Sequence, residues 1–382
     1  MSDPDRRSDG AFHRILQSLG DQGRIKHLPP PGTNSLSSND YLGLARHPEV
    51  IEAAVKAVST YGTGSTGSRF LSGNLELSEE LEFRIAKFKA PESGHGRVFS
   101  SGYHANLSVL SIFSPHAGAR YSDAENHASL IDGFRMGQKP VHIFPHNDWR
   151  WVEAHISRNR IKSPLIVTES LFSMSGEIGC LPELYHIAKK HDGLLVIDDA
   201  HATGTLGPTG RGGLEYFNLP FDPGHMILTG TFSKSLGSLG GFALLKEDFR
   251  TVLSSLGRPF IYTTALPPGV LAASIKSLEI LDRSPDLTKR LQTLSATWQH
   301  RLKRVALKTP IINLKKNRIP LEDISRAFSD RGFLLPVLRH PTVPKGQECL
   351  RLSVSLNWGE KIENTLMEIF ANQMEGDDGQ ND

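Results

Sequence analysis

An acidic and a basic residue each follow an apolar run in the middle of the chain. Asp198 ends the run LLVID, and Lys234 lies in GTFSKSLGSLGG, just after the run MILTG. A carboxylate at the end of a buried strand is costly to bury unless a cationic or protonated partner lies near it. Runs about one strand–helix–strand unit apart can form adjacent strands, so we predict that both side chains enter the same crevice.

This pair has the chemistry that pyridoxal 5'-phosphate requires. A lysine held among small residues near a cofactor loses solvation, and its neutral amine can attack a carbonyl group. A carboxylate that keeps a pyridine nitrogen protonated makes the ring an electron sink. We therefore predict that Lys234 and Asp198 hold this cofactor.

Further polar residues follow the other apolar runs and fit the same cofactor. Gly102 and Tyr103 lead into HANLSVLSIF, and a glycine-containing turn at a helix N-terminus offers N–H groups to a phosphate. Thr231 can add a hydroxyl to that phosphate. His127 can stack on the ring, and His201 can reach its phenolic oxygen. Each of these residues alone has a duller explanation, such as a surface charge or a helix cap, so the prediction depends on their joint occurrence.

The elements that must position these residues are short apolar runs that alternate with helical stretches. The runs are RVFSSG, ARYSDAENH, VHIFPHND, LIVTES, LLVIDDAH, MILTGTFSK and FALLK. This alternation predicts an α/β large domain with a mainly parallel sheet flanked by helices. Helical patterns with two weaker strand candidates, IINL and CLRLSVSL, follow and predict a smaller C-terminal α+β domain. We expect an N-terminal helix and connector over 1–45, the large domain over 46–270, and the small domain with an acidic tail over 271–382.

Helical patterns also precede the first of these runs. Apolar residues at i, i+3, i+4 and i+7 predict a short helix that ends near Gly20, namely Phe12, Ile15, Leu16 and Leu19. Asn74 is predicted to cap a helix whose buried stripe is Leu77, Leu81, Ile85 and Phe88.

The composition excludes several classes of protein. Lys and Arg number 43 and Asp and Glu number 41, a net charge of +2, which argues against nucleic acid as a main partner. Two cysteines are too few for a disulfide framework or a cysteine-rich metal site. No apolar h-region follows the N-terminus, and no apolar run approaches the roughly 20 residues that span a bilayer. We therefore expect a cytoplasmic protein that binds neither nucleic acid nor membranes.

Three patterns could mislead. The segment GTGSTG (62–67) matches a dinucleotide-binding fingerprint, but a helical pattern precedes it instead of the strand that the fingerprint requires. His142 and His146 are four residues apart, but Pro145 lies between them and prevents a shared helix face. The acids and the histidine of DDAH could ligate a metal, but no further cluster supports them. We therefore expect no metal.

Motifs along most of the chain resemble the α-oxoamine synthase family of fold-type-I pyridoxal phosphate enzymes. They are SSNDYLGL (37–44), YGTGSTGSRFLSGN (61–74), FSSGYHAN (99–106), DAENHASLIDG (123–133), VTESLFSMSGEIGCL (167–181), VIDDAHATGTLGPTGRGG (196–213), TGTFSKSLGSLGGF (229–242) and RPFIYTTALPP (258–268). The resemblance covers residues 12–370 and implies the fold of that group.

The resemblance also implies roles for matching residues. Lys234 would carry the cofactor and act as the base, Asp198 would pair with the pyridinium, and His201 would bond the phenolic oxygen. The ring would contact His127 and Ser173, with His127 also placed to polarise the acyl carbonyl. The phosphate would bind Gly102, Tyr103 and Thr231, and the partner subunit's phosphate would bind Thr263 or Thr264, because family members are homodimers with active sites at the interface. The substrates would contact Asn39, Arg351, Thr342 and Arg24, with Arg351 on the amino-acid carboxylate.

The implied reaction is a decarboxylative condensation. The segment HPTVPKGQECLRLS (340–353) and the chain length point to a member that joins L-alanine to a pimeloyl thioester, carried by coenzyme A or acyl carrier protein, in biotin biosynthesis. One alternative is a sibling synthase of the threonine-pathway, haem, sphingoid or signalling-ketone type, which uses glycine or serine or another acyl thioester. A second is a non-catalytic scaffold subunit, which should have lost Lys234.

Two segments stay open at this stage. Residues 301–318 contain seven basic residues and no acidic one. We interpret them as a solvated face of the small domain, and the alternative is a docking site for acyl carrier protein or for the phosphates of coenzyme A. The basic residues are Arg301, Lys303, Arg304, Lys308, Lys315, Lys316 and Arg318. Family members usually have a small-residue and histidine-containing stretch where this chain has Leu356, Asn357 and Trp358. We expect these three to reshape the substrate channel.

Overall fold

The computed structural model describes residues 5–22, 24–25, 28–92, 94–302, 307–315, 320–340 and 342–374, and the side chains among them outside 5–9 and 371–374. The chain forms two compact units. We call residues 38–313 with 353–364 the large unit, and residues 1–37, 314–352 and 365–382 the small unit.

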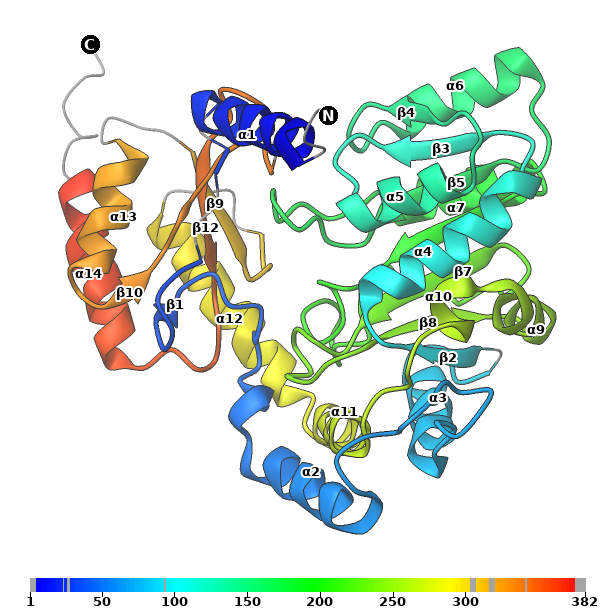
Figure 1. The fold of residues 1–382 in the computed structure, drawn as a ribbon, viewed down its shortest axis with the longest axis horizontal. Helices are drawn as coiled ribbons and strands as arrows, with labels where there is room; N and C mark the ends of the chain where they lie inside the picture. Colours follow the sequence, from blue (N-terminus) through cyan, green and yellow to red (C-terminus); the bar gives the residue numbers. More distant parts are fainter. Residues whose placement is uncertain are drawn as a thin grey trace. The chain divides into compact units, whose positions relative to one another are not determined.

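A seven-stranded sheet forms the centre of the large unit, in the order β2-β8-β7-β6-β5-β3-β4 (Figure 1). The strands are β2 (His95–Phe99), β3 (Arg120–Asp123), β4 (His142–Phe144), β5 (Leu165–Glu169), β6 (Leu194–Asp198), β7 (Met226–Thr231) and β8 (Gly241–Leu245). Neighbours from β4 to β7 pair in parallel, and β8 is antiparallel to both β2 and β7. The predicted mainly parallel sheet is confirmed, and each predicted run contains one strand.

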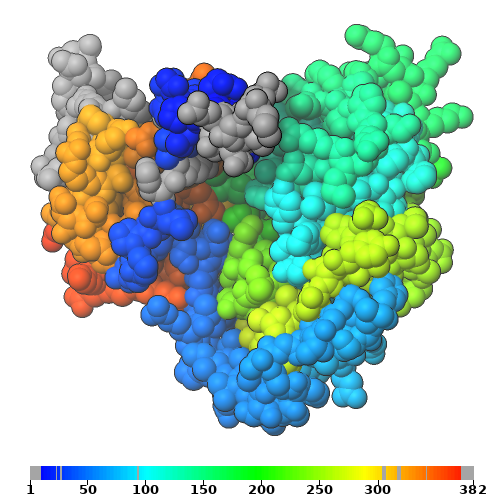
Figure 2. Space-filling model, viewed as in Figure 1, coloured from blue at the N-terminus to red at the C-terminus, as the bar shows by residue number. Residues whose placement is uncertain are grey.

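Helices cover this sheet because its strands are apolar on both faces. The helices of the large unit are α2 (Pro48–Tyr61), α3 (Glu76–Lys89), α4 (Gly102–Phe113), α5 (Ala128–Met136), α6 (Trp149–Asn159), α7 (Leu181–Lys190), α8 (Gly213–Tyr216), α9 (Glu247–Leu256), α10 (Arg258–Ile261), α11 (Pro268–Arg283) and α12 (Asp286–Arg301). Two short 3-10 helices are η1 (Leu44–Arg46) and η2 (Ser114–His116). Helix α2 packs along α11, and in the space-filling view its blue segment lies at the molecular surface (Figure 2).

The predicted cap at Asn74 is wrong. Helix α3 begins at Glu76, and Leu75 occupies the N-cap position without a side-chain hydrogen bond. The Asn74 side chain instead accepts a hydrogen bond from Nε of Arg69 at 2.6 Å and donates one to Glu79 at 2.8 Å. These contacts engage the amide that capping would require.

The small unit is built around short strands. Strand β1 (Asn34–Ser35) pairs in parallel with β10 (Phe333–Leu334). Strands β11 (Val337–Leu338), β12 (Cys349–Ser353) and β9 (Ile311–Lys315) form a three-stranded sheet in that order. The helices are α1 (Asp5–Asp21), α13 (Leu321–Ser329) and α14 (Glu360–Met374). Both weaker strand candidates are therefore strands, and the predicted N-terminal helix exists but begins earlier than its apolar pattern indicated.

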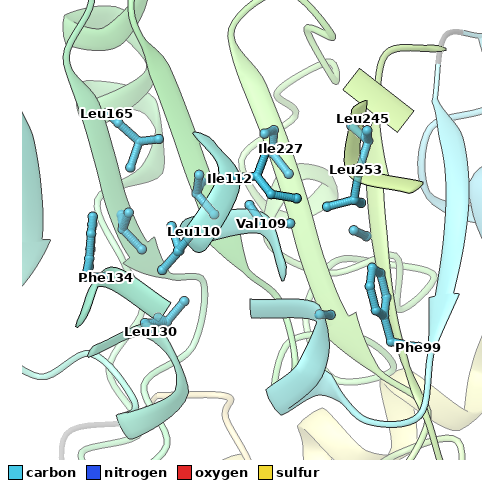
Figure 3. Close-up of a cluster of buried hydrophobic side chains, with 14 of the residues drawn as sticks. Phe99, Val109, Leu110, Ile112, Leu130, Phe134, Leu165, Ile227, Leu245 and Leu253 are labelled. Carbon is cyan, nitrogen blue, oxygen red and sulfur yellow. The ribbon is translucent and has the colours of Figure 1, made fainter. Parts of the chain in front are cut away.

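The main core cluster lies where α4 and α5 pack on the sheet (Figure 3). Val109 and Leu110 of α4 are fully buried, as are Val196 of β6 and Ile227 of β7. This packing fixes α4, and with it the helix N-terminus at Gly102, relative to the ends of the central strands. None of the helices in the described parts of the chain combines the length and apolar character needed to cross a bilayer.

Leu110→Ala should lower the free energy of unfolding by about 2–5 kcal/mol, because it removes a fully buried side chain and leaves a cavity. Urea denaturation of the cofactor-free protein measures this change. Leu256→Ala in α9 is the control, since Leu256 is exposed. An equal effect of both substitutions would show that the cluster around Leu110 does not stabilise the fold.

Candidate active site

Two carboxylates end neighbouring strands at the carboxyl edge of the large sheet. Glu169 ends β5 and Asp198 ends β6, and the two are paired in the register of these strands. Both are buried, with 2% and 6% of their surface exposed. Since two negative charges at this spacing repel each other, the surrounding residues must supply donors and positive charge.

Asp198 receives hydrogen bonds from two elements. The Asn106 side chain in α4 donates to Oδ2 from Nδ2 at 2.7 Å, and the Ala200 backbone N–H donates to Oδ1 at 2.9 Å. Asn106 also accepts a hydrogen bond from the Thr229 hydroxyl in β7 at 2.7 Å. Asn106 and the Ala200 backbone therefore orient the carboxylate directly, and Thr229 orients it indirectly by fixing Asn106.

Glu169 and His127 feel the charges of Asp198 and Lys234. Burial raises the pKa of Glu169 well above its usual range, the charge of Asp198 raises it further, and the charge of Lys234 opposes the rise. Burial lowers the pKa of His127, against an opposing effect of Asp198 and with a further lowering by Lys234. The sheet edge thus brings the predicted lysine, acid and histidine into one electrostatic site.

His127 is the N-cap of α5 and is held on several sides. Its backbone N–H donates to Oε1 of Glu169 at 2.6 Å, and its Nδ1 lies 2.8 Å from the Ser129 hydroxyl. The Tyr103 ring packs edge-on against the imidazole, with 6.3 Å between centroids. Tyr103 in turn donates to Asp132.

His201 contacts the segment that carries Asn39. The Tyr41 hydroxyl lies 2.8 Å from Nδ1 of His201 and donates to Oδ1 of Asn39 at 2.9 Å. The backbone N–H of Leu356 donates to the Tyr41 carbonyl at 2.9 Å, and Asn357 donates to Asp40 at 3.1 Å. Two of the three residues that depart from the family pattern therefore hold this segment, and the third, Trp358, packs edge-on against Trp298. Their effect on a substrate channel stays a prediction.

The predicted phosphate ligands lie at the start of α4 and the end of β7. The backbone N–H groups of Gly102 and Tyr103 begin the helix and have no carbonyl partner among the residues that the structure describes. A Cβ at Gly102 would lie 3.2 Å from both the Gly230 carbonyl and Cβ of Thr231, so a larger residue here would require these neighbours to shift. The Thr231 hydroxyl contacts the Ser233 hydroxyl and the Gly240 carbonyl, both at 2.7 Å.

Thr263 and Thr264 line a small cavity of the large unit with Arg69 and Ser100. Ser173 lies in the turn after β5, and its backbone N–H donates to Glu169.

The predicted acyl and carboxylate contacts belong to the small unit. Arg351 is buried on β12, where its backbone carbonyl accepts from the Ser37 hydroxyl at 2.8 Å. Arg24 donates to Gln22 at 3.2 Å, and Thr342 is exposed.

The basic segment is described in part. Arg301 packs its guanidinium over the Trp298 ring, 5.1 Å from the centroid, and Lys308 and Lys315 are exposed. Four members of the run lie outside the described residues, namely Lys303, Arg304, Lys316 and Arg318. A solvated face and a docking site for acyl carrier protein or coenzyme A both stay predictions for this segment.

A buried ion pair supports the turn after Asp198. Lys89 of α3 donates to Asp199, and both side chains are enclosed. Asp199 also accepts from the Ser170 hydroxyl at 2.6 Å and from the Gly213 backbone N–H at 2.9 Å. Asp199 therefore faces a separate network and fixes the turn that carries Asp198 and His201. No group of three or more metal-ligating side chains suited to an ion occurs among the described residues.

Sequence reasoning missed Asn106, Ser129, Tyr41 and Lys89 as parts of the site. The signal for Asn106 was a polar residue on the buried face of an apolar helix, where an amide needs partners. Lys89 carried a similar signal in α3. Tyr41 and Ser129 gave none, because a tyrosine or serine in a loop or helix start is common.

Comparison with known proteins identifies the family. The model of aminotransferase class I and II matches residues 33–365. The chain belongs to this family. Its fold, the fold type I of pyridoxal phosphate enzymes, is confirmed by solved structures, including a serine palmitoyltransferase from S. paucimobilis with bound PLP and myriocin. That chain has a TM-score of 0.81 and 28% identity, and the match covers 98% of this chain and 99% of that one.

Several curated relatives of this chain are 8-amino-7-oxononanoate synthases. An 8-amino-7-oxononanoate synthase from Citrifermentans bemidjiense is 37% identical over 359 residues, which cover 91% of this chain and 90% of the relative. A crystal structure of 8-amino-7-oxononanoate synthase from Francisella tularensis has a TM-score of 0.74 and 28% identity, with 91% and 99% of the two chains covered. The resemblance to α-oxoamine synthases is therefore confirmed.

Lys89→Met should lower the free energy of unfolding by about 3–5 kcal/mol, because it leaves Asp199 buried without its cation. Urea denaturation measures the loss, and Lys87→Met, an exposed site of the same helix, is the control. We also expect Lys89→Met to weaken binding of pyridoxal phosphate, measured by absorbance titration. Equal stability and equal affinity in both variants would contradict a supporting role for the ion pair.

Proposed function

We propose that this chain catalyses the decarboxylative condensation of L-alanine with a pimeloyl thioester, with pyridoxal 5'-phosphate as cofactor, in biotin biosynthesis. The products are 8-amino-7-oxononanoate, carbon dioxide and the free thiol. The proposal is supported by the positions of His127, Asp198 and Lys234 at or just after the carboxyl ends of β3, β6 and β7, in a chain 37% identical to a synthase of that name. The thioester is carried by coenzyme A or acyl carrier protein.

The donor set of the site fits pyridoxal phosphate. Asp198 is a buried, oriented carboxylate that can keep a pyridine nitrogen protonated. The N–H groups at the start of α4, which have no carbonyl partner among the described residues, suit a phosphate, and the Thr231 hydroxyl would join them by turning from the Gly240 carbonyl. Lys234 would supply the amine that attaches the aldehyde, and His127 and Ser173 would contact the ring. When bound, the cofactor supplies an electron sink that stabilises negative charge on Cα of the amino acid.

The chain's own residues then move protons and orient the substrates. Lys234 removes the Cα proton of alanine and later returns a proton to the same carbon. His127 donates a hydrogen bond to the thioester carbonyl oxygen while a bond forms between Cα and the carbonyl carbon. The carbon–sulfur bond breaks and the thiol leaves with a proton, and the alanine carboxylate leaves as carbon dioxide. Arg351 holds that carboxylate by a bidentate contact, Asn39 contacts the amino acid, and Thr342 and Arg24 contact the acyl chain.

We infer that the chain acts as a homodimer whose partner completes each active site. Apolar side chains of α2 and the loop after it are exposed, namely Ile51, Val55, Tyr61, Phe70 and Leu71, and Tyr262 beyond α10 is exposed as well. The segment that carries α2 is blue in Figure 2 and lies at the surface of the view. Monomeric soluble proteins seldom expose large apolar patches, so this number of exposed apolar side chains supports an interface. Thr263 and Thr264 lie beside Tyr262 and would reach the partner subunit's phosphate.

Turnover with alanine, glycine and serine tests the reaction directly. With pimeloyl-coenzyme A and pimeloyl-acyl carrier protein as donors, we expect alanine to give 8-amino-7-oxononanoate, identified by mass spectrometry. Lys234→Ala should lower turnover by about 10⁴-fold or more, because it removes the attachment point and the base together. Preferred use of serine with a longer acyl donor would instead support the activity of the serine palmitoyltransferases, which this chain also resembles in structure.

Leu71→Glu should shift the protein from dimer to monomer, because it places a charge in the apolar surface formed with α2. Sedimentation velocity measures the change, and Ile143→Glu is the control because Ile143 is an exposed apolar residue of β4, at the end of the strand order opposite β2. A wild-type monomer, or a dimer that both substitutions leave intact, would overturn the dimer interface proposed here.

A further inference from the structure

A chain of buried hydrogen bonds connects Asp198 to His127. Nδ2 of Asn106 donates to Oδ2 of Asp198 at 2.7 Å and to the Ser129 hydroxyl at 2.8 Å. The Ser129 hydroxyl lies 2.8 Å from Nδ1 of His127. Asn106 and Ser129 are 2% and 1% exposed, so water does not replace these partners. The carboxylate and the imidazole are therefore linked through two neutral side chains that the proposed reaction does not otherwise use.

The partners of Asn106 fix the orientation of its amide. A carboxylate only accepts hydrogen bonds, so the group that faces Asp198 must be the NH₂. The Thr229 hydroxyl donates to Oδ1 from the other side at 2.7 Å. Both N–H bonds and the oxygen of the amide are thus engaged. Because Asn106 donates to the Ser129 oxygen, the Ser129 hydroxyl proton is available for His127.

The surroundings of His127 select one protonation site on its ring. The Ser129 backbone N–H also points at Nδ1 of His127, at 3.2 Å, and a backbone N–H can only donate. Two donors therefore face Nδ1, which must act as an acceptor. A neutral imidazole carries one proton, so that proton lies on Nε2.

We propose that Asn106 and Ser129 are positioning residues that hold His127 as its Nε2–H tautomer, so that Nε2 donates to the acyl carbonyl oxygen. The donation to an acyl carbonyl rests on the proposed function, but the tautomer itself does not depend on which substrates bind. Asn106 performs two tasks, since the same NH₂ orients Asp198 and directs the Ser129 hydroxyl. The two ends of the cofactor site, acid and histidine, are thereby set by one amide.

Burial favours the neutral form of His127, and the charged groups around it act in both directions. Burial lowers the pKa of the imidazole, and the positive charge of Lys234 lowers it further. The negative charges of Asp198 and Asp132 oppose this effect. Glu169 accepts from the backbone N–H of His127, and burial keeps its own pKa high. A neutral ring whose single proton lies on Nε2 can polarise a carbonyl oxygen by donating from that nitrogen.

Nitrogen NMR of the full-length protein tests the tautomer directly. With ¹⁵N-labelled histidine rings and His127→Gln to assign the signal, the cofactor-free and pyridoxal phosphate-loaded protein should each show Nδ1 as the unprotonated nitrogen and Nε2 as the protonated one at neutral pH. Protonated Nδ1 in the wild-type protein would overturn the proposal.

Two variants test the residues that set it. Ser129→Ala removes the nearer donor to Nδ1, and Asn106→Ala frees the Ser129 oxygen to accept from Nδ1, so that only the backbone N–H at 3.2 Å still favours the Nε2–H tautomer. Each variant should therefore shift part of the tautomer population toward Nδ1–H, and Ser129→Ala should lower kcat about 3- to 10-fold with little change in the KM for alanine. Ser108→Ala is the matched control, because Ser108 is a fully buried serine of α4 whose hydroxyl has no partner among the described residues. An unchanged tautomer in both variants would contradict the positioning role of Asn106 and Ser129. Failure of the condensation alone would leave the NMR result standing and would contradict only the proposed reaction.

Discussion

The burial of two carboxylates side by side is the constraint on which the large unit depends. Glu169 and Asp198 end adjacent parallel strands and face each other in register. Parallel topology places both at the same edge, where loops and helix N-termini gather. The repulsion between them is tolerable only because Glu169 holds its proton more tightly than usual and Asp198 receives an amide and a backbone donor. The same compensation creates a site that can hold a cationic ring and a lysine amine.

Asp198 and Asp199 are neighbours in the sequence, but their side chains lie in different hydrogen-bond networks. Asp198 accepts from Asn106 and the Ala200 backbone, and Asp199 points into a network with Lys89, Ser170 and Gly213. A buried ion pair is a weak source of stability, but removing one member is costly. We interpret the pair as a fixed point for the turn that carries His201. Tyr41 then holds that histidine from another segment.

The sequence predicted the strands well because a sheet covered on both faces requires continuous apolar runs, and the polar residues after LLVID and MILTG marked its carboxyl edge. It did not predict the partners of those residues. Asn106, Ser129 and Tyr41 act through contacts made across distant segments, which local patterns do not encode. The cap at Asn74 failed for a local reason, because Arg69, five residues away, engages the amide. The roles of Arg351, Thr342 and Arg24 stay predictions.

The central claim is that Lys234, which follows the strand next to that of Asp198, is the residue that binds pyridoxal phosphate covalently. Borohydride treatment of the loaded protein reduces the link between a lysine amine and the cofactor's aldehyde, so that the added mass survives digestion. Peptide mapping by mass spectrometry should then find the modification on the peptide that contains Lys234. A modification on Lys89 or another lysine instead, or no modification in a protein that has bound the cofactor, would contradict this account.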